Sequence, residues 1–196
     1  MREARNNIIH GLLTTVEVDG KPYLINSDFR VGIQCARVLD DIDLSDEESY
    51  FILYTLLYAE GNRPPYNAQA LNMALEFYIA NQFALYDAKK AKGQASTGRS
   101  FCWDYDIDLV IADFQREYGI DLCNENLRMH WHRFIALFRG LSADSRVAQI
   151  RNIRTQRVSD NAGAEQRRVI DQQKRMSSLP PRNREEHIQQ QKARYE

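Results

Sequence analysis

Residues 124–141 read NENLRMHWHRFIALFRGL and place two histidines around a tryptophan. Because an α-helix turns about 100° per residue, the spacing predicts a helix with one continuous apolar side. The apolar residues on the same side as Trp131 are Leu127, Phe134, Phe138 and Leu141. We therefore expect Trp131 to be a core residue of a helical domain.

The two histidines fall about 100° to either side of Trp131 on such a helix. His130 then lies at the edge of the apolar side, whereas His132 lies among polar positions near Arg128 and Arg139. Two imidazoles that diverge in this way do not share a metal ion, and the i, i+4 spacing of HExxH is absent. We expect His130 to donate a hydrogen bond at the core edge, and we expect replacement of His132 to cost little stability.

Residues 14–26, TTVEVDGKPYLIN, predict a β-hairpin. Asp19-Gly20 suits a two-residue type I′ turn, because glycine tolerates the positive φ that this turn requires. The resulting register pairs Val18 with Lys21, Glu17 with Pro22, and Val16 with Tyr23. Pro22 is compatible with this register when its strand lies at an edge.

Helical patterns follow the hairpin. Ser27 and Asp28 can cap a helix that runs to about Leu39, and Ser45 and Glu48 have the spacing of a capping box. The helix that this box begins includes YFILYTLLYA (residues 50–59), which is apolar on nearly every side. Such a helix must be buried on most sides or contact a partner. Another apolar helix begins near Asn67, and residues 87–100 are expected to form a flexible loop.

The second half of the chain predicts three further helical segments besides 124–141. The first has Ile107, Ile111, Phe114 and Tyr118 on one face, and Gly119 is placed to cap it in a left-handed conformation. The second spans 142–158, and a weaker helix falls within 159–196. The tail beyond it has almost nothing to bury and is expected to be disordered alone.

These patterns indicate a mainly α protein: an N-terminal β-hairpin, a multi-helix domain and a flexible basic C-terminal tail. The expected organisation is an extension over 1–13, a hairpin and helical domain over 14–158, and the weak helix and tail over 159–196.

No catalytic, cofactor or metal site is predicted. DYDID (residues 104–108) lacks the glycine and the distal glutamate of a calcium loop, so we expect its carboxylates to serve the start of a helix. The sequence has no GxxxxGK[ST], no GxSxG and no Cys-His signature. We therefore expect a protein that is not an enzyme.

The charge is unevenly distributed. Residues 1–120 carry 11 Lys and Arg against 18 Asp and Glu, whereas residues 121–196 carry 15 against 9. This asymmetry favours contacts with oppositely charged partners or between copies of the chain. The three widely spaced cysteines predict reduced thiols in a cytoplasm, and no apolar run approaches the roughly 20 residues that span a bilayer.

Several stretches resemble a phage family often called the gene-product-fifteen family. They are VDGKPYLINSDFRV, DxxxVIADFxxxYGIDL, HWHRFIALFRGL, IRNIRTQRV and the late SLP, in one collinear order over roughly residues 14–180. The sequence departs from the family at His132, where a second aromatic residue is expected after HW, and in its longer polar tail. The resemblance implies a mostly helical, non-catalytic tail assembly chaperone of long-tailed phages and prophages. Such a protein binds the tape-measure protein in the host cytoplasm and is absent from the mature virion.

Two sets of side chains are candidates for partner binding. Tyr50, Tyr54 and Tyr58 recur at i, i+4 and i+8, and tyrosine suits a surface that is wet when free and dry when bound. The second set is Arg151, Arg154 and Arg157, along one side of the helix over 142–158. The candidate partners are the tape-measure protein, a second copy of the chain and a longer frameshifted product, with no membrane contact.

Two alternative functions remain open at this stage. The arginine-rich helices suit a phage protein that binds nucleic acid, although interspersed acidic residues disfavour this interpretation. The second alternative is a structural tail or connector protein that stays in the virion.

Overall fold

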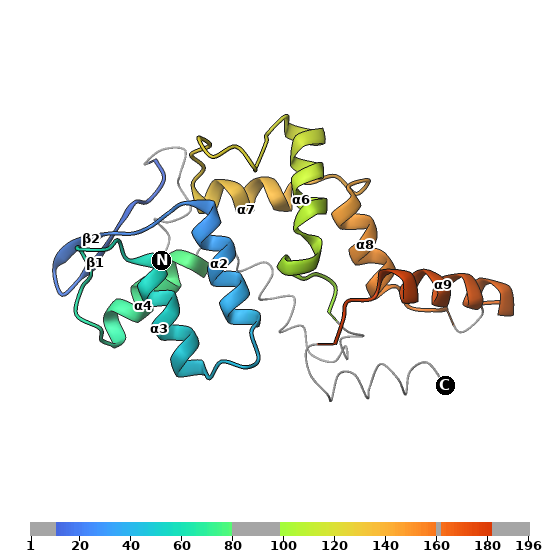
Figure 1. The fold of residues 1–196 in the computed structure, drawn as a ribbon, viewed down its shortest axis with the longest axis horizontal. Helices are drawn as coiled ribbons and strands as arrows, with labels where there is room; N and C mark the ends of the chain where they lie inside the picture. Colours follow the sequence, from blue (N-terminus) through green and yellow to red (C-terminus); the bar gives the residue numbers. More distant parts are fainter. Residues whose placement is uncertain (1–10, 80–98, 160–161, 182–196) are drawn as a thin grey trace. The chain divides into compact units, whose positions relative to one another are not determined.

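The computed structural model describes residues 11–79, 99–159 and 162–181 (Figure 1). In these ranges it contains seven helices and one two-stranded antiparallel sheet, which confirms a mainly α protein with an N-terminal hairpin. Most of the expected loop over 87–100, the N-terminal extension up to residue 10 and the tail beyond residue 181 lie outside the described residues.

The chain divides into two compact units. Unit 1 comprises Met1–Gly93 and Cys123–Gly140, and unit 2 comprises Gln94–Leu122 and Leu141–Glu196. The chain therefore leaves unit 1, returns to it for one helix, and leaves it again.

Unit 1 begins with the hairpin of β1 (Thr15–Val18) and β2 (Lys21–Leu24). Its register pairs Val18 with Lys21 and Glu17 with Pro22, as predicted. Asp19 and Gly20 both have positive φ, 50° and 74°, as a type I′ turn requires. The short-range turn chemistry therefore determines this element.

Over residues 25–79 of unit 1 the hairpin is followed by α2 (Phe29–Asp40), α3 (Asp46–Leu57) and α4 (Ala68–Ile79). The predicted caps are confirmed, because Asp28 accepts the Arg30 backbone N–H at 2.8 Å and Ser45 and Glu48 form a complete capping box. The α3 helix ends two residues earlier than the pattern predicts. Its end is fixed by the hairpin strand, because the Asn26 N–H donates to the Leu57 carbonyl and Tyr58 pairs with Ile25.

Among the described residues of unit 1 there is a further helix, α7 (Trp131–Arg139), which is shorter than the helix predicted over 124–141. Residues 129–131 instead run antiparallel to residues 27–29. The Phe29 N–H donates to the Met129 carbonyl at 3.0 Å, and the Trp131 N–H donates to the Ser27 carbonyl at 2.6 Å. Because these bonds hold the backbone extended, the helix begins only at Trp131, and Leu127 lies outside it.

Trp131 is buried, as predicted. Its ring lies 5.4 Å from that of Tyr78 and nearly parallel to it, and its indole N–H donates to the Tyr78 carbonyl at 3.1 Å. On α2, a Cβ added to Gly32 would lie 2.1 Å from a carbon of the indole ring. Only glycine therefore allows α2 to approach Trp131 this closely.

Unit 2 contains α6 (Trp103–Tyr118), α8 (Arg146–Thr155) and α9 (Ala164–Ser177). Gly119 has φ 66° at the end of α6, and the Ile120 N–H donates to the Phe114 carbonyl at 3.3 Å, which confirms the predicted cap. The α8 helix lies within the predicted 142–158 but begins later, because Ser145 caps it by accepting the Ala148 N–H. The weak C-terminal helix is confirmed as α9.

Candidate functional site

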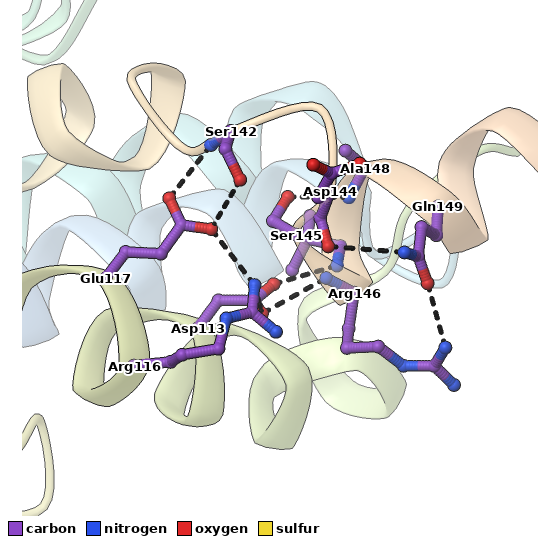
Figure 2. Close-up of polar contacts among 10 residues, drawn as sticks. Asp113, Arg116, Glu117, Ser142, Asp144, Ser145, Arg146, Ala148 and Gln149 are labelled. Carbon is purple, nitrogen blue, oxygen red and sulfur yellow. Dashed lines mark hydrogen bonds and ion pairs between the residues drawn. The ribbon is translucent and has the colours of Figure 1, made fainter.

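Two aspartates seven residues apart on α6 are buried, and each binds one end of α8. Asp113 has no exposed surface, and its carboxylate accepts the backbone N–H groups of Arg146 at 3.1 Å and Val147 at 2.9 Å (Figure 2). These are the first two residues of α8, where a helix leaves N–H groups unpaired and favours negative charge. Arg116 completes the arrangement with an ion pair to Asp113 at 2.8 Å.

Asp106 holds the other end of α8 through Arg154. The two guanidinium nitrogens lie 2.6 Å and 2.9 Å from the two carboxylate oxygens, which makes a bidentate ion pair. Asp106 also accepts the Cys102 N–H at 2.8 Å at the start of α6. Arg154 donates in addition to the Ser177 carbonyl at the end of α9. We call Asp106, Asp113 and Arg154 the α6–α8 clamp.

A third carboxylate on α6 positions the turn before α8. Glu117 accepts the backbone N–H of Ser142 at 2.9 Å and its hydroxyl at 2.8 Å (Figure 2). These hydrogen bonds, with a smaller contribution from Arg116, hold the pKa of Glu117 below its ordinary value. The three carboxylates each accept donors from unit 2, so their arrangement serves packing rather than proton transfer. The part of the chain that the structure describes contains no group of three or more His, Cys, Asp or Glu able to hold a metal ion.

The two histidines of MHWHRF lie close together, contrary to the prediction. Their ring centroids are 4.8 Å apart, because His130 precedes the helix and caps it by accepting the His132 N–H on Nδ1. The Nε2 of His130 then donates to the Leu13 carbonyl at 2.8 Å, which confirms its expected hydrogen bond at the core edge.

His132 is buried, so its expected position among polar residues on the surface is wrong, and a low cost of its replacement no longer follows. Its Nε2 donates to the Phe77 carbonyl at 2.8 Å, and its ring lies 4.7 Å from that of Phe77. Burial lowers the pKa of both histidines below the ordinary value, which favours the neutral imidazoles.

The three candidate tyrosines do not form one exposed stripe. Tyr50 is exposed, whereas Tyr54 and Tyr58 expose only 6% and 1% of their surface. Their hydroxyls donate to the carbonyls of Pro64 and Ala70, and burial raises the pKa of Tyr58 to about 12. The expected stripe is wrong because α3 ends at Leu57 and α4 covers its last turn. A role of these tyrosines in partner binding stays a prediction, with Tyr50 the accessible member.

The three candidate arginines are also in different environments. Arg154 belongs to the α6–α8 clamp and is largely buried. Arg151 is half-buried, and Arg157 is exposed but lies beyond the end of α8 at Thr155. Binding of a partner by Arg151 and Arg157 stays a prediction, whereas Arg154 already bonds to carboxylate and carbonyl oxygens of its own unit.

An exposed aromatic pair lies beside the buried tyrosines and was not singled out from the sequence. Phe51 and Tyr66 expose 51% and 50% of their surface, and their rings meet edge to face at 5.4 Å. Tyr66 also contacts the buried Tyr54 at 5.0 Å. Both exposed rings therefore rest on the core of unit 1. The sequence pattern indicates this pair only indirectly. The helix that includes residues 50–59 has no polar face, so some of its apolar side chains are expected to lie outside the core.

Further exposed residues lie in the last turn of α2, in the turn that joins α2 to α3, and in the first turns of α3. The α2–α3 surface is defined by the apolar residues Leu39, Ile42, Tyr50, Phe51 and Tyr66 and the carboxylates Asp41, Asp43, Asp46 and Glu47. No lysine or arginine occurs between Arg37 and Arg63. The surface therefore combines exposed apolar side chains with an acidic rim, an arrangement that suits a protein partner.

A family model described as Bacteriophage Gp15 protein matches residues 9–179. The chain belongs to this family. No curated protein and no solved structure matches it. Among the described residues of this Gp15 family member, no helix is both long and apolar enough to cross a membrane.

The motifs that carry the resemblance are largely structural in this Gp15 family member. DxxxVIADF supplies Asp106 and Asp113, and IRNIRTQRV supplies Arg154, so two separate motifs together form the α6–α8 clamp. HWHRFIALFRGL supplies Trp131 and its neighbours in the core of unit 1. These motifs maintain the fold, and the exposed α2–α3 surface lies outside them.

Proposed function

We propose that the chain is a tail assembly chaperone that binds the tape-measure protein during phage tail assembly and catalyses no reaction. Membership in the bacteriophage Gp15 family supports a role in phage biology. The observation that carries the binding function is the exposed Phe51–Tyr66 pair on the α2–α3 surface.

The chemistry of this surface suits such a partner. A tape-measure protein is a very long helical chain with apolar stripes, and it is prone to aggregate until tail-tube subunits cover it. Exposed rings supported by a core bind an apolar helix face with little loss of side-chain freedom. An acidic rim adds orientation for basic residues beside that face and weakens the complex when salt rises.

The proposal includes release. A chaperone that acts in the host cytoplasm and is absent from the mature virion must exchange its partner for tube subunits. A compact surface of a few anchor residues is compatible with exchange, because a small number of side chains supplies most of the binding free energy.

The test is co-expression with the tape-measure protein of the same phage. Phe51→Ser with Tyr66→Ser removes both exposed rings, and Tyr105→Ser removes a similarly exposed ring from α6 in unit 2 as a matched control. We expect the first variant to lose most of the soluble tape-measure protein and the control to retain it. Circular dichroism confirms that both variants are folded.

A folded Phe51→Ser/Tyr66→Ser variant that still keeps the tape-measure protein soluble would remove this surface from the mechanism. Purified phage particles address the structural alternative, because a connector protein stays in the particle and a chaperone does not. The nucleic-acid alternative has less support than its sequence pattern indicates, since Arg154 is bound to Asp106.

A further inference from the structure

The α9 helix carries two exposed stripes of different chemistry. Val169 and Met176 are seven residues apart and therefore lie on one side of the helix, and Met176 exposes 82% of its surface. Arg168 and Arg175 repeat the same spacing one position earlier and are exposed as well. On its other side, α9 buries Ile170. The helix therefore has an apolar stripe flanked by a basic stripe, and both face solvent.

The α2–α3 surface has the complementary composition. It exposes Leu39, Ile42 and Phe51. Asp43 follows Ile42 in the chain, and Glu47 lies one helical turn before Phe51 on α3, so both exposed carboxylates are near exposed apolar residues. A helix binds such a surface by packing apolar residues at i and i+7 while flanking charges pair at the rim. Arginine suits these pairs because its planar guanidinium binds a carboxylate through two hydrogen bonds.

We propose that α9 of one copy of the chain binds the α2–α3 surface of another copy. In this contact Val169 and Met176 pack against the apolar residues, and Arg168 and Arg175 face Asp43 and Glu47. Each copy carries one surface of each kind, so the contact is heterologous and can continue from copy to copy. The charge of the whole sequence is divided in the same way: the α2–α3 surface lies in the acidic residues 1–120, and α9 lies in the basic residues 121–196. The inference concerns the chain alone and does not rest on the proposed function.

The first measurement is sedimentation velocity of the full chain over a range of concentrations. We expect species larger than the monomer that grow with concentration. They should dissociate between about 0.1 M and about 1 M NaCl, over which the Debye length falls from about 10 Å to about 3 Å. A chain that stays monomeric at every concentration in low salt would overturn the proposal.

Charge reversal identifies the surfaces. Arg168→Glu/Arg175→Glu makes the α9 stripe acidic, and Asp43→Lys/Glu47→Lys makes the rim of the α2–α3 surface basic. We expect each variant alone to associate at least tenfold more weakly than the wild type. Arg128→Glu/Arg133→Glu changes the net charge as much as the α9 variant does, at exposed positions outside both surfaces, and should associate like the wild type.

Mixing the two reversed variants separates contacts between copies from a contact within one chain. In the mixture, the acidic α9 of the first variant binds the basic α2–α3 surface of the second. The unchanged basic α9 of the second variant binds the unchanged acidic surface of the first. We expect association to return, which no contact within one chain can produce. Variants that associate like the wild type, or a mixture that stays monomeric, would overturn the proposal. Val169→Ser/Met176→Ser repeats the test without a charge change and should also weaken association.

Discussion

The two units of this protein are stabilised in different ways. Unit 1 has a core of stacked rings, in which Phe134 of α7 stacks on Phe29 of α2 and on Trp131. The described residues of unit 2 include few buried rings, and α6 and α8 are joined by the carboxylates and the guanidinium of the α6–α8 clamp. Apolar packing dominates one unit, and directed polar bonds set the arrangement of helices in the other.

The difference has consequences for where a partner can bind. Apolar packing is not directional, and a unit built from rings can keep some of them at its surface, as Phe51 and Tyr66 show. A buried ion pair contributes less net stability than apolar groups of the same volume, but removing one partner is costly because the other charge stays buried. In unit 2 the α6–α8 clamp therefore fixes the orientation of the helices. Its charged groups already bond to one another and to the backbone, so they are less suited to binding a partner.

The largest effect is expected in the core of unit 1. Trp131→Ala should lower the free energy of unfolding by about 3–5 kcal/mol, as replacement of a buried aromatic residue does. Urea titration measures the change, and hydrogen exchange shows whether it is confined to the amides of unit 1. A cost below about 0.5 kcal/mol, which is typical of surface positions, would contradict the burial of this ring.

The clamp of unit 2 should show a smaller but strongly coupled effect. Arg154→Met should cost about 3 kcal/mol, because the Asp106 carboxylate stays buried without its partner. Adding Asp106→Leu should cost less than the sum of the two single replacements. Urea titrations of both single variants and the double variant measure this coupling, and additive costs would show that the ion pair is not a unit.

The buried His132 of unit 1 predicts a dependence on pH. Because the folded-state pKa of His132 lies below its unfolded value, the unfolded chain binds a proton first as the pH falls. Stability is therefore full above about pH 6.5 and decreases below it, by about 1.4 kcal/mol for each unit of pKa depression. His132→Gln should reduce the slope of stability against pH between about pH 7 and pH 5. An unchanged slope would show that His132 does not titrate in this way.

The smallest effect is expected at the exposed end of α3. Tyr50→Ser should change stability by less than about 0.5 kcal/mol, because the side chain lies at the surface. Tyr54→Phe, one turn later, should cost about 1 kcal/mol, since it leaves the Pro64 carbonyl without its hydrogen bond. Thermal melts of the two variants compare them directly, and equal costs would remove the distinction between surface and core on this helix.

Features determined by neighbouring residues were predictable from the sequence. The Asp19-Gly20 turn, the Ser45–Glu48 capping box and the Gly119 cap each depend on residues a few positions apart. Their geometry is set by backbone preferences and short hydrogen bonds, so the pattern alone determines them.

Features that depend on distant residues were not predictable. The start of α7 is fixed by Ser27 and Phe29, about a hundred positions earlier, and without those bonds the pattern placed His132 on the wrong side. Arg154 resembles a solvent-exposed arginine in the sequence because its partner, Asp106, lies 48 positions away. Likewise, no sequence pattern within residues 123–140 predicts that this segment belongs to unit 1.

The central claim is that the tape-measure protein binds the α2–α3 surface of unit 1. Hydrogen exchange of the chain, with and without the tape-measure protein, tests it most directly. We expect exchange to slow at the amides of α3 and of Tyr66, and to stay unchanged in α6 and α8. Protection confined to unit 2, or no protection in a mixture that forms a complex, would contradict the claim.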